Sequence, residues 1–293
     1  MMGKLMWIVI CLILSGFRVS SLEPHAPLYE EGGNQVLSQR DGEYFTTTVR
    51  GKLREDMPGF SFDIEARFNE KNSCYQVKSV TVREKDEVLQ VISVPELSLF
   101  GETAVWEDLE ECMGLELEDV NFDGYKDIRL FDTPNGNYLE EWIYLVWNPK
   151  TGQFEHDPRL NGIPLAGFDQ ETRLIYGMAR SGANRHYYYT YQYLDGEPVK
   201  IREEHSVYLG EPDSEVLRRC LGQAAGAEKT SDEDVEAAEI CHETVWERNP
   251  DTGEMEQTRD EFRFYLSAED GVGELVTVEA DSEMGKLLSE EEG

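Results

Sequence analysis

The stretch LEDVNFDGYKDIRL, residues 117–130, places oxygen-bearing side chains at alternate positions around a sharp bend. The oxygens come from the side chains of Asp119, Asn121, Asp123 and Asp127, and from the backbone carbonyl of Tyr125. Gly124 stands at the sixth position, where a glycine permits the turn that folds such groups around one point. Hard oxygen ligands at this spacing favour Ca²⁺, so the stretch predicts a calcium-binding turn.

The residues on either side of this turn predict strands. LELEDV before it alternates apolar and polar residues, and IRLF after it is apolar and β-prone. The twelfth position is Leu130, where an EF-hand loop has a bidentate glutamate. We therefore expect a strand–turn–strand unit in which the calcium is structural.

The pattern beyond the turn predicts a mainly β protein built from antiparallel hairpins, with a propeller-like or stacked-sheet architecture. Runs of β-branched and aromatic residues recur from residue 44 onward, bounded by turn signals. The sequence Asn-Pro-x-Thr-Gly occurs twice, at residues 148–152 and 249–253, and predicts two hairpin turns. The two copies indicate either an internal repeat or one hairpin solution used twice. Residues 102–113 and 213–225 have short helical patterns.

The first residues predict export. An apolar run, LMWIVICLILSGF, follows Lys4, and small residues at 19–21 suit a signal peptidase, so the chain is expected to be secreted, periplasmic or in the cell envelope. This run is too short to span a bilayer, and no second run could cross one. The predicted plan is a signal peptide at 1–21, a flexible leader at 22–43, a β-rich calcium-binding domain at 44–210, a helix and acidic loop at 211–236, a C-terminal hairpin packed on the same domain at 237–280 and a disordered acidic tail at 281–293.

The chain is strongly acidic, with 60 Asp and Glu residues against 27 Lys and Arg residues and a net charge of −33. Such a surface repels nucleic acid and anionic lipid. It favours cations and basic proteins, mainly through the rate of encounter. The alternative is that the acidity only keeps an exported protein in solution.

Four cysteines follow the predicted signal peptide, and an even count in an exported chain indicates two disulfide bonds. Three pairings of Cys74, Cys112, Cys220 and Cys241 are possible. The local pairs, Cys74–Cys112 and Cys220–Cys241, are preferred, and each could stabilise the fold by ~3–4 kcal/mol.

No catalytic motif stands out. The five histidines are scattered without the spacing of metal ligands, and the chain contains neither HExxH nor G-x-S-x-G. We therefore expect a protein that binds its partner and does not catalyse a reaction.

The residues DVNFDGYKDI resemble the calcium loop of FG-GAP and VCBS-type repeats in β-propeller proteins. This resemblance implies that Asp119, Asn121, Asp123, Asp127 and the Tyr125 carbonyl bind the ion. Residues 60–210 more widely resemble exported bacterial proteins with a propeller-like fold, which are related to periplasmic lysozyme inhibitors and to immunity proteins against peptidoglycan hydrolases.

The wider resemblance implies inhibition of a basic lysozyme-like enzyme, or binding to another envelope component. Those inhibitors insert an S-G-x-x-Y loop into the enzyme cleft; here Ser181 and Gly182 match, and Tyr187 comes two residues late. Arg185 makes the same loop basic. The rival prediction is a cell-surface module that binds glycan or protein through Tyr187, Tyr189 and the alternating tyrosines that follow, which share one face of a strand. Those tyrosines could equally fill a sheet face.

Overall fold

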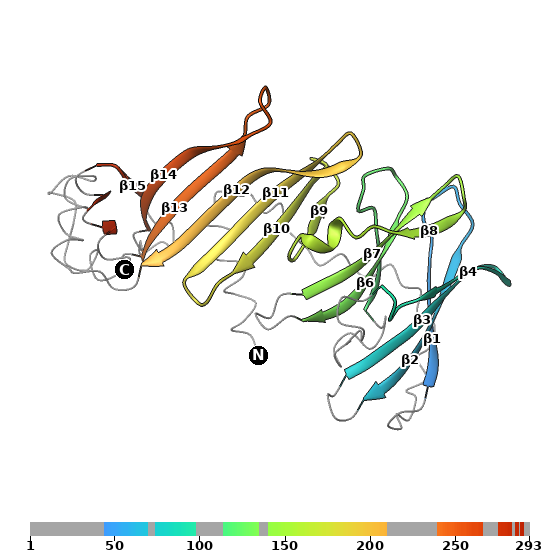
Figure 1. Ribbon diagram of the computed structural model, residues 1–293. Helices are drawn as coiled ribbons and strands as arrows, with labels where there is room; N and C mark the ends of the chain where they lie inside the picture. Colours follow the sequence, from blue (N-terminus) through green and yellow to red (C-terminus); the bar gives the residue numbers. More distant parts are fainter. Residues whose placement is uncertain are drawn as a thin grey trace.

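The computed structural model describes residues 44–69, 74–97, 114–134, 140–209, 239–265, 275–282, 285–286 and 288–289. These residues form three antiparallel sheets that follow one another along an elongated molecule (Figure 1). Within each sheet the strands keep their order in the chain, so every strand pairs with the next strand in the sequence. The prediction of a mainly β, antiparallel fold is confirmed.

The first two sheets have four strands each. In β2 of the first sheet buried residues alternate with partly exposed ones, because one face meets the core. In β7 of the second sheet residues 142–145 are all buried, so both faces of that strand are covered. The first sheet contains β1 (Tyr44–Gly51), β2 (Phe60–Asn69), β3 (Cys74–Glu84) and β4 (Glu87–Ser93). The second contains β5 (Leu115–Glu118), β6 (Asp127–Pro134), β7 (Glu140–Asn148) and β8 (Gln153–His156).

The third sheet has seven strands and extends away from the other two (Figure 1). A short 3-10 turn, η2 (Leu160–Gly162), connects β8 to it. Strand β13 pairs with β12, although residues 210–238 separate them in the chain. The strands are β9 (Gly167–Asp169), β10 (Leu174–Arg180), β11 (Arg185–Leu194), β12 (Glu197–Leu209), β13 (Glu239–Arg248), β14 (Met255–Tyr265) and β15 (Leu275–Glu279).

One apolar core joins the first two sheets to the near end of the third. Phe62, Ile64 and Val80 of the first sheet, Ile128 of the second and Ile175 of the third are all fully buried within it. Burying side chains of this size contributes about 1.5–3 kcal/mol each. The outer strands of the third sheet lie beyond this cluster, so their stability must come from elsewhere.

The two Asn-Pro-x-Thr-Gly sequences form the predicted hairpin turns, between β7 and β8 and between β13 and β14. In each turn the glycine N–H donates to the asparagine carbonyl, at 2.9 Å for Asn148 and 2.8 Å for Asn249. Gly152 and Gly253 have φ of 68° and 76°, which the turn requires and which glycine adopts without strain. The same local sequence therefore builds the same turn twice.

One prediction differs from the structure. Cys241 is a free, buried thiol in the middle of β13, between Tyr208 of β12 and Arg263 of β14, and not half of a Cys220–Cys241 disulfide. Within the predicted tail, Leu288 is fully buried. Cys112, Cys220, the side chain of Cys74, and the predicted helices at 102–113 and 213–225 lie outside the described residues.

Candidate functional site

The predicted cation turn connects β5 to β6, and its own polar side chains hold its backbone. Asp119 accepts hydrogen bonds from the N–H groups of Asp123 and Gly124, at 3.1 and 2.8 Å. Asn121 accepts from the Asp123 N–H at 3.0 Å, and Asp123 accepts from the Tyr125 N–H at 2.9 Å. Gly124 has a φ of 89°, which only glycine adopts freely. The side chains of Asp119, Asn121 and Asp123 therefore all bond to the backbone of the same bend.

Asp127 has a different position from the other predicted ligands. Its side chain is fully buried, and its two oxygens accept hydrogen bonds from the Val120 N–H at 3.0 Å and the Trp147 N–H at 2.8 Å. Trp147 belongs to β7, so this carboxylate fastens the turn to the strand beside β6. Each of its oxygens retains one further lone pair after these bonds.

The turn also touches the other two sheets. The Lys126 N–H donates to the carbonyl of Leu53, which follows β1, at 2.7 Å. From the β9–β10 turn, the Gln170 amide donates to the Asp119 carbonyl at 2.8 Å. The Phe122 ring lies 6.1 Å from the Tyr193 ring of β11. The cation turn is therefore the place where all three sheets meet.

Burial and like charge raise the pKa of two carboxyl groups in the turn. Burial raises the pKa of Asp119, and the nearby charge of Asp123 adds to the effect. Burial raises the pKa of Asp127 to about 8, with smaller contributions from Asp123 and Asp119 and with opposition from the hydrogen bonds of Trp147 and Val120. A bound cation would favour the charged form of both carboxyl groups, because it offsets their burial and the repulsion between them.

The donor set of the turn fits calcium in its chemistry, since all its groups are oxygens. Throughout the described ranges, however, no group of three or more His, Cys, Asp and Glu side chains is placed so that it could hold a metal ion. A complete set of calcium ligands therefore needs oxygens from other groups, here the Asn121 amide and the Tyr125 carbonyl. Asp127 would join it only through its remaining lone pairs.

The predicted tyrosine face lies on β11, and the structure extends it across two further strands. Tyr187 pairs with His205 of β12, and their rings lie 4.7 Å apart. His205 in turn lies 4.6 Å from the ring of Trp246 on β13. We call Tyr187, His205 and Trp246 the ring row. All three side chains are half-buried, so each keeps some surface open to solvent.

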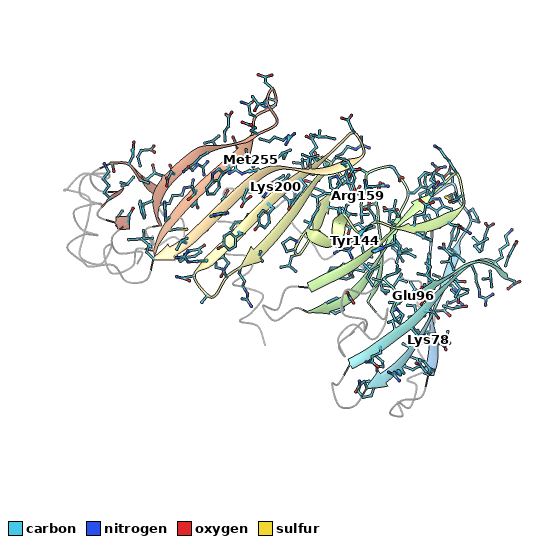
Figure 2. All side chains as sticks on the ribbon, viewed as in Figure 1. Lys78, Glu96, Tyr144, Arg159, Lys200 and Met255 are labelled. Atoms are coloured by element: carbon cyan, nitrogen blue, oxygen red, sulfur yellow. The ribbon has the colours of Figure 1, made fainter. Side chains whose placement is uncertain are left out.

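Polar groups stand beside the ring row on the same face. A ring nitrogen of His205 is 2.7 Å from the Glu203 carboxylate, and Lys200 also bonds to Glu203. Lys200 lies 5.4 Å from the centre of the Tyr189 ring, so an internal ammonium group covers that tyrosine. Figure 2 labels Lys200 on the seven-stranded sheet. Tyr189, a predicted binding residue, therefore lies beside the ring row, and Lys200 covers part of its ring.

The opposite face of the same strands is charged. Glu204 of β12 and Glu243 of β13 are each 2% exposed. Arg202 bonds to Glu204 at 2.8 Å, and Arg263 bonds to Glu243 at 2.7 Å. Ion pairs therefore lie beside buried apolar side chains on this face, such as Val245 of β13, which is 1% exposed.

The predicted loop residues Ser181, Gly182 and Arg185 lie at the tip of the β10–β11 hairpin, where residues 180–185 are all exposed. The Ser181 N–H donates to the Arg185 carbonyl at 2.9 Å, which closes the tip. Tyr187 lies two residues inside β11, with its ring on the sheet face. The structure thus separates the tip from the tyrosine that was predicted to act with it.

Sequence reasoning missed His205 and Trp246. The strand-forming stretches EEHSVYL (203–209) and VWER (245–248) were visible, but only the pairing register of β11, β12 and β13 brings His205 and Trp246 beside Tyr187. The same applies to Arg159, whose guanidinium connects the segment after β8 to the β11–β12 turn through the Gly196 carbonyl at 3.1 Å (Figure 2).

Comparison with known proteins gives little likeness. No protein-family model and no curated protein matches the chain. The solved structure of a Xanthomonas type IV secretion system related protein is similar with a TM-score of 0.44 and 13% sequence identity, over 73% of this chain and 99% of that one. None of the helices in the described part of the chain has both the length and the hydropathy of a membrane-spanning segment.

Proposed function

We propose that this chain is an exported, calcium-stabilised protein that binds a glycan of the cell envelope through the ring row. The observation that carries the proposal is the contact of three partly open rings, Tyr187, His205 and Trp246, across three neighbouring strands outside the apolar core. Rings on neighbouring strands form a surface whose shape depends on the sheet and not on a mobile loop. The predicted export signal at residues 5–17 supports a target outside the cytoplasm.

The chemistry of this face suits a sugar. Aromatic side chains offer apolar surface to the C–H groups of a sugar ring, while Tyr and His add polar atoms at the edge. The Glu203 carboxylate, 2.7 Å from His205, adds an acceptor for hydroxyl groups. This is the usual arrangement of a ligand site, in which mostly apolar contact area is oriented by a few polar groups.

Calcium has a structural role in this proposal. Asp119, Asn121, Asp123, Asp127 and the Tyr125 carbonyl would hold the ion, which would neutralise the carboxylates of the turn. Support comes from the raised pKa of Asp119 and of Asp127 and from the contacts of this turn with all three sheets. Bound calcium would then stabilise the joined sheets by linkage.

The test measures binding of the purified mature chain to soluble fragments of envelope glycan by calorimetry. We expect binding that Trp246→Ala and Tyr187→Ala each weaken at least tenfold, the loss of a ring contact of about 1.4 kcal/mol or more. Val91→Ala is the control, because Val91 is 64% exposed on a different sheet. Equal binding by all four proteins would reject the ring row as the site.

A second candidate, inhibition of a lysozyme-like hydrolase, is favoured by the exposed tip. Arg180 and Arg185 flank Ser181 and Gly182 in an otherwise acidic chain. A lysis assay with a basic lysozyme tests it: inhibition by the wild type that is lost in Ser181→Ala and Arg185→Ala, and retained in a Lys150→Ala control at another turn, supports this function. Unchanged lysis with micromolar wild-type protein rejects it.

A further inference from the structure

Strand β1 is an unusual sheet edge in this molecule. It pairs with β2 over eight consecutive residues, from Tyr44 with Arg67 to Gly51 with Phe60, without a bulge. Within the described part of the chain, no strand pairs with its outer side. A long, regular and unpaired edge is a template for another strand, and proteins normally protect such edges.

The other sheet edges in the described part of the chain are shorter or interrupted. Strands β5, β9 and β15 have four, three and five residues. Strand β8 also has four, and the Gln90 side chain covers its edge: its amide donates to the Phe154 carbonyl at 2.9 Å and accepts from the Phe154 N–H at 2.8 Å. Strand β4 has a bulge against β3 at Val82–Arg83. Each of these edges thus has a feature that hinders pairing with another strand, and β1 has none of them.

The sequence of β1 is complementary to itself in one antiparallel register, the one centred on Thr47. On the outer face, where Tyr44, Thr46, Thr48 and Arg50 are exposed, Thr46 would then face Thr48 of the second copy and Tyr44 would face Arg50. On the inner face Phe45 would meet Val49. Threonine pairs and aromatic–β-branched pairs each stabilise a sheet by about 0.2–1 kcal/mol.

Charge also favours a second copy at this sheet. Residues 44–94 contain eight basic and eight acidic residues, whereas the whole chain has a net charge of −33. Two copies of such an acidic chain repel each other over most of their surfaces. The first sheet is where they can approach with the least repulsion.

From these observations we infer that β1 is a homodimer interface, in which two copies pair antiparallel about Thr47 and join their first sheets into one eight-stranded sheet. The ring row lies on the third sheet, far along the chain from this edge. The dimer would therefore carry two ring rows, and two linked sites raise the avidity for a repeating polymer.

Sedimentation velocity of the mature chain over the micromolar range tests the inference. We expect a concentration-dependent dimer, which Thr46→Lys weakens at least tenfold because a lysine on an edge strand opposes pairing. Val91→Lys, at an exposed position on the opposite edge of the same sheet, is the matched control and should leave the dimer unchanged.

Cysteine capture tests the register independently of that variant. In the proposed pairing, Thr47→Cys faces itself across the dimer axis, at a Cα separation of about 4.5–5.5 Å that a disulfide can span. Thr46→Cys faces Thr48 and should not be captured. A monomer at all concentrations, a dimer unaffected by Thr46→Lys, or equal capture of both cysteine variants would each overturn the inference.

Discussion

The first two sheets and the outer strands of the third sheet are stabilised in different ways. Phe62, Ile64 and Val80 of the first sheet lie in one fully buried apolar cluster. The outer strands β12 and β13 instead bury charged groups, such as Glu204 and Glu243, on one face and carry the ring row on the other. In the first region these side chains are used for packing, whereas the second region presents rings and paired charges on its strands.

This difference indicates a division of roles within one β protein. Apolar packing is the stronger source of stability, since buried ion pairs gain little over their desolvation cost. The outer strands combine ion pairs with a few buried apolar side chains, such as Val245 and Phe262, and leave the ring row partly open. The cation turn connects the first two sheets to the near end of the third, because it contacts Leu53 after β1 and Gln170 before β10.

Truncation in the apolar core should have the largest effect. Phe62→Ala removes a fully buried ring and is expected to lower the free energy of unfolding by about 3–5 kcal/mol. Urea titration followed by circular dichroism measures it. A loss below about 1 kcal/mol would contradict the assignment of the main core to the first two sheets.

Breaking an ion pair in the outer strands should have the next largest effect. Glu243→Gln removes the buried negative charge to which Arg263 bonds at 2.7 Å and leaves the longer ion pair of Arg263 with Glu261, at 3.2 Å. We expect a loss of about 2–3 kcal/mol, less than for a fully buried pair, because the Arg263 side chain keeps 14% of its surface exposed. The same urea titration applies, and a neutral result would show that apolar contacts, not ion pairs, hold β13 and β14.

Removal of calcium should have a smaller effect. At millimolar calcium and a dissociation constant of about 10⁻⁴ M, bound ion would contribute about 1.4 kcal/mol. We expect a chelator to lower the melting temperature of the wild type and to leave Asp123→Asn unchanged. Gln170→Ala, which removes a contact of the turn without altering a predicted ligand, is the control that should keep the calcium response.

The smallest effect on stability is expected at the ring row. Tyr187→Phe removes only a hydroxyl from a half-buried ring and should change the free energy of unfolding by less than about 0.5 kcal/mol. Glycan binding should nevertheless weaken. A large loss of stability would show that Tyr187 fills the sheet and is no recognition residue.

Local sequence predicted most strands and turns of this fold. The alternation in β2 and the Asn-Pro-x-Thr-Gly turns depend on nearby residues alone, and both appear as expected. The pairing of β12 with β13 across residues 210–238 does not, and it decides where His205 and Trp246 meet.

The candidate site shows the same limit. The side chains of the cation turn were identified from their spacing, but the double hydrogen bond of Asp127 to Val120 and to Trp147 depends on β7 lying beside β6. The free thiol of Cys241 likewise follows from its place in the middle of a sheet. Long-range register, which no short pattern encodes, is what the structure adds.

Hydrogen exchange of the backbone amides, followed by mass spectrometry with and without calcium, tests the central claim most directly. If an ion-stabilised turn joins the three sheets, calcium will slow exchange in peptides that contain Asp119–Asp127 and also in those that contain Trp147 and Gln170–Arg173. Exchange that is the same with and without calcium in all of these peptides would contradict the account.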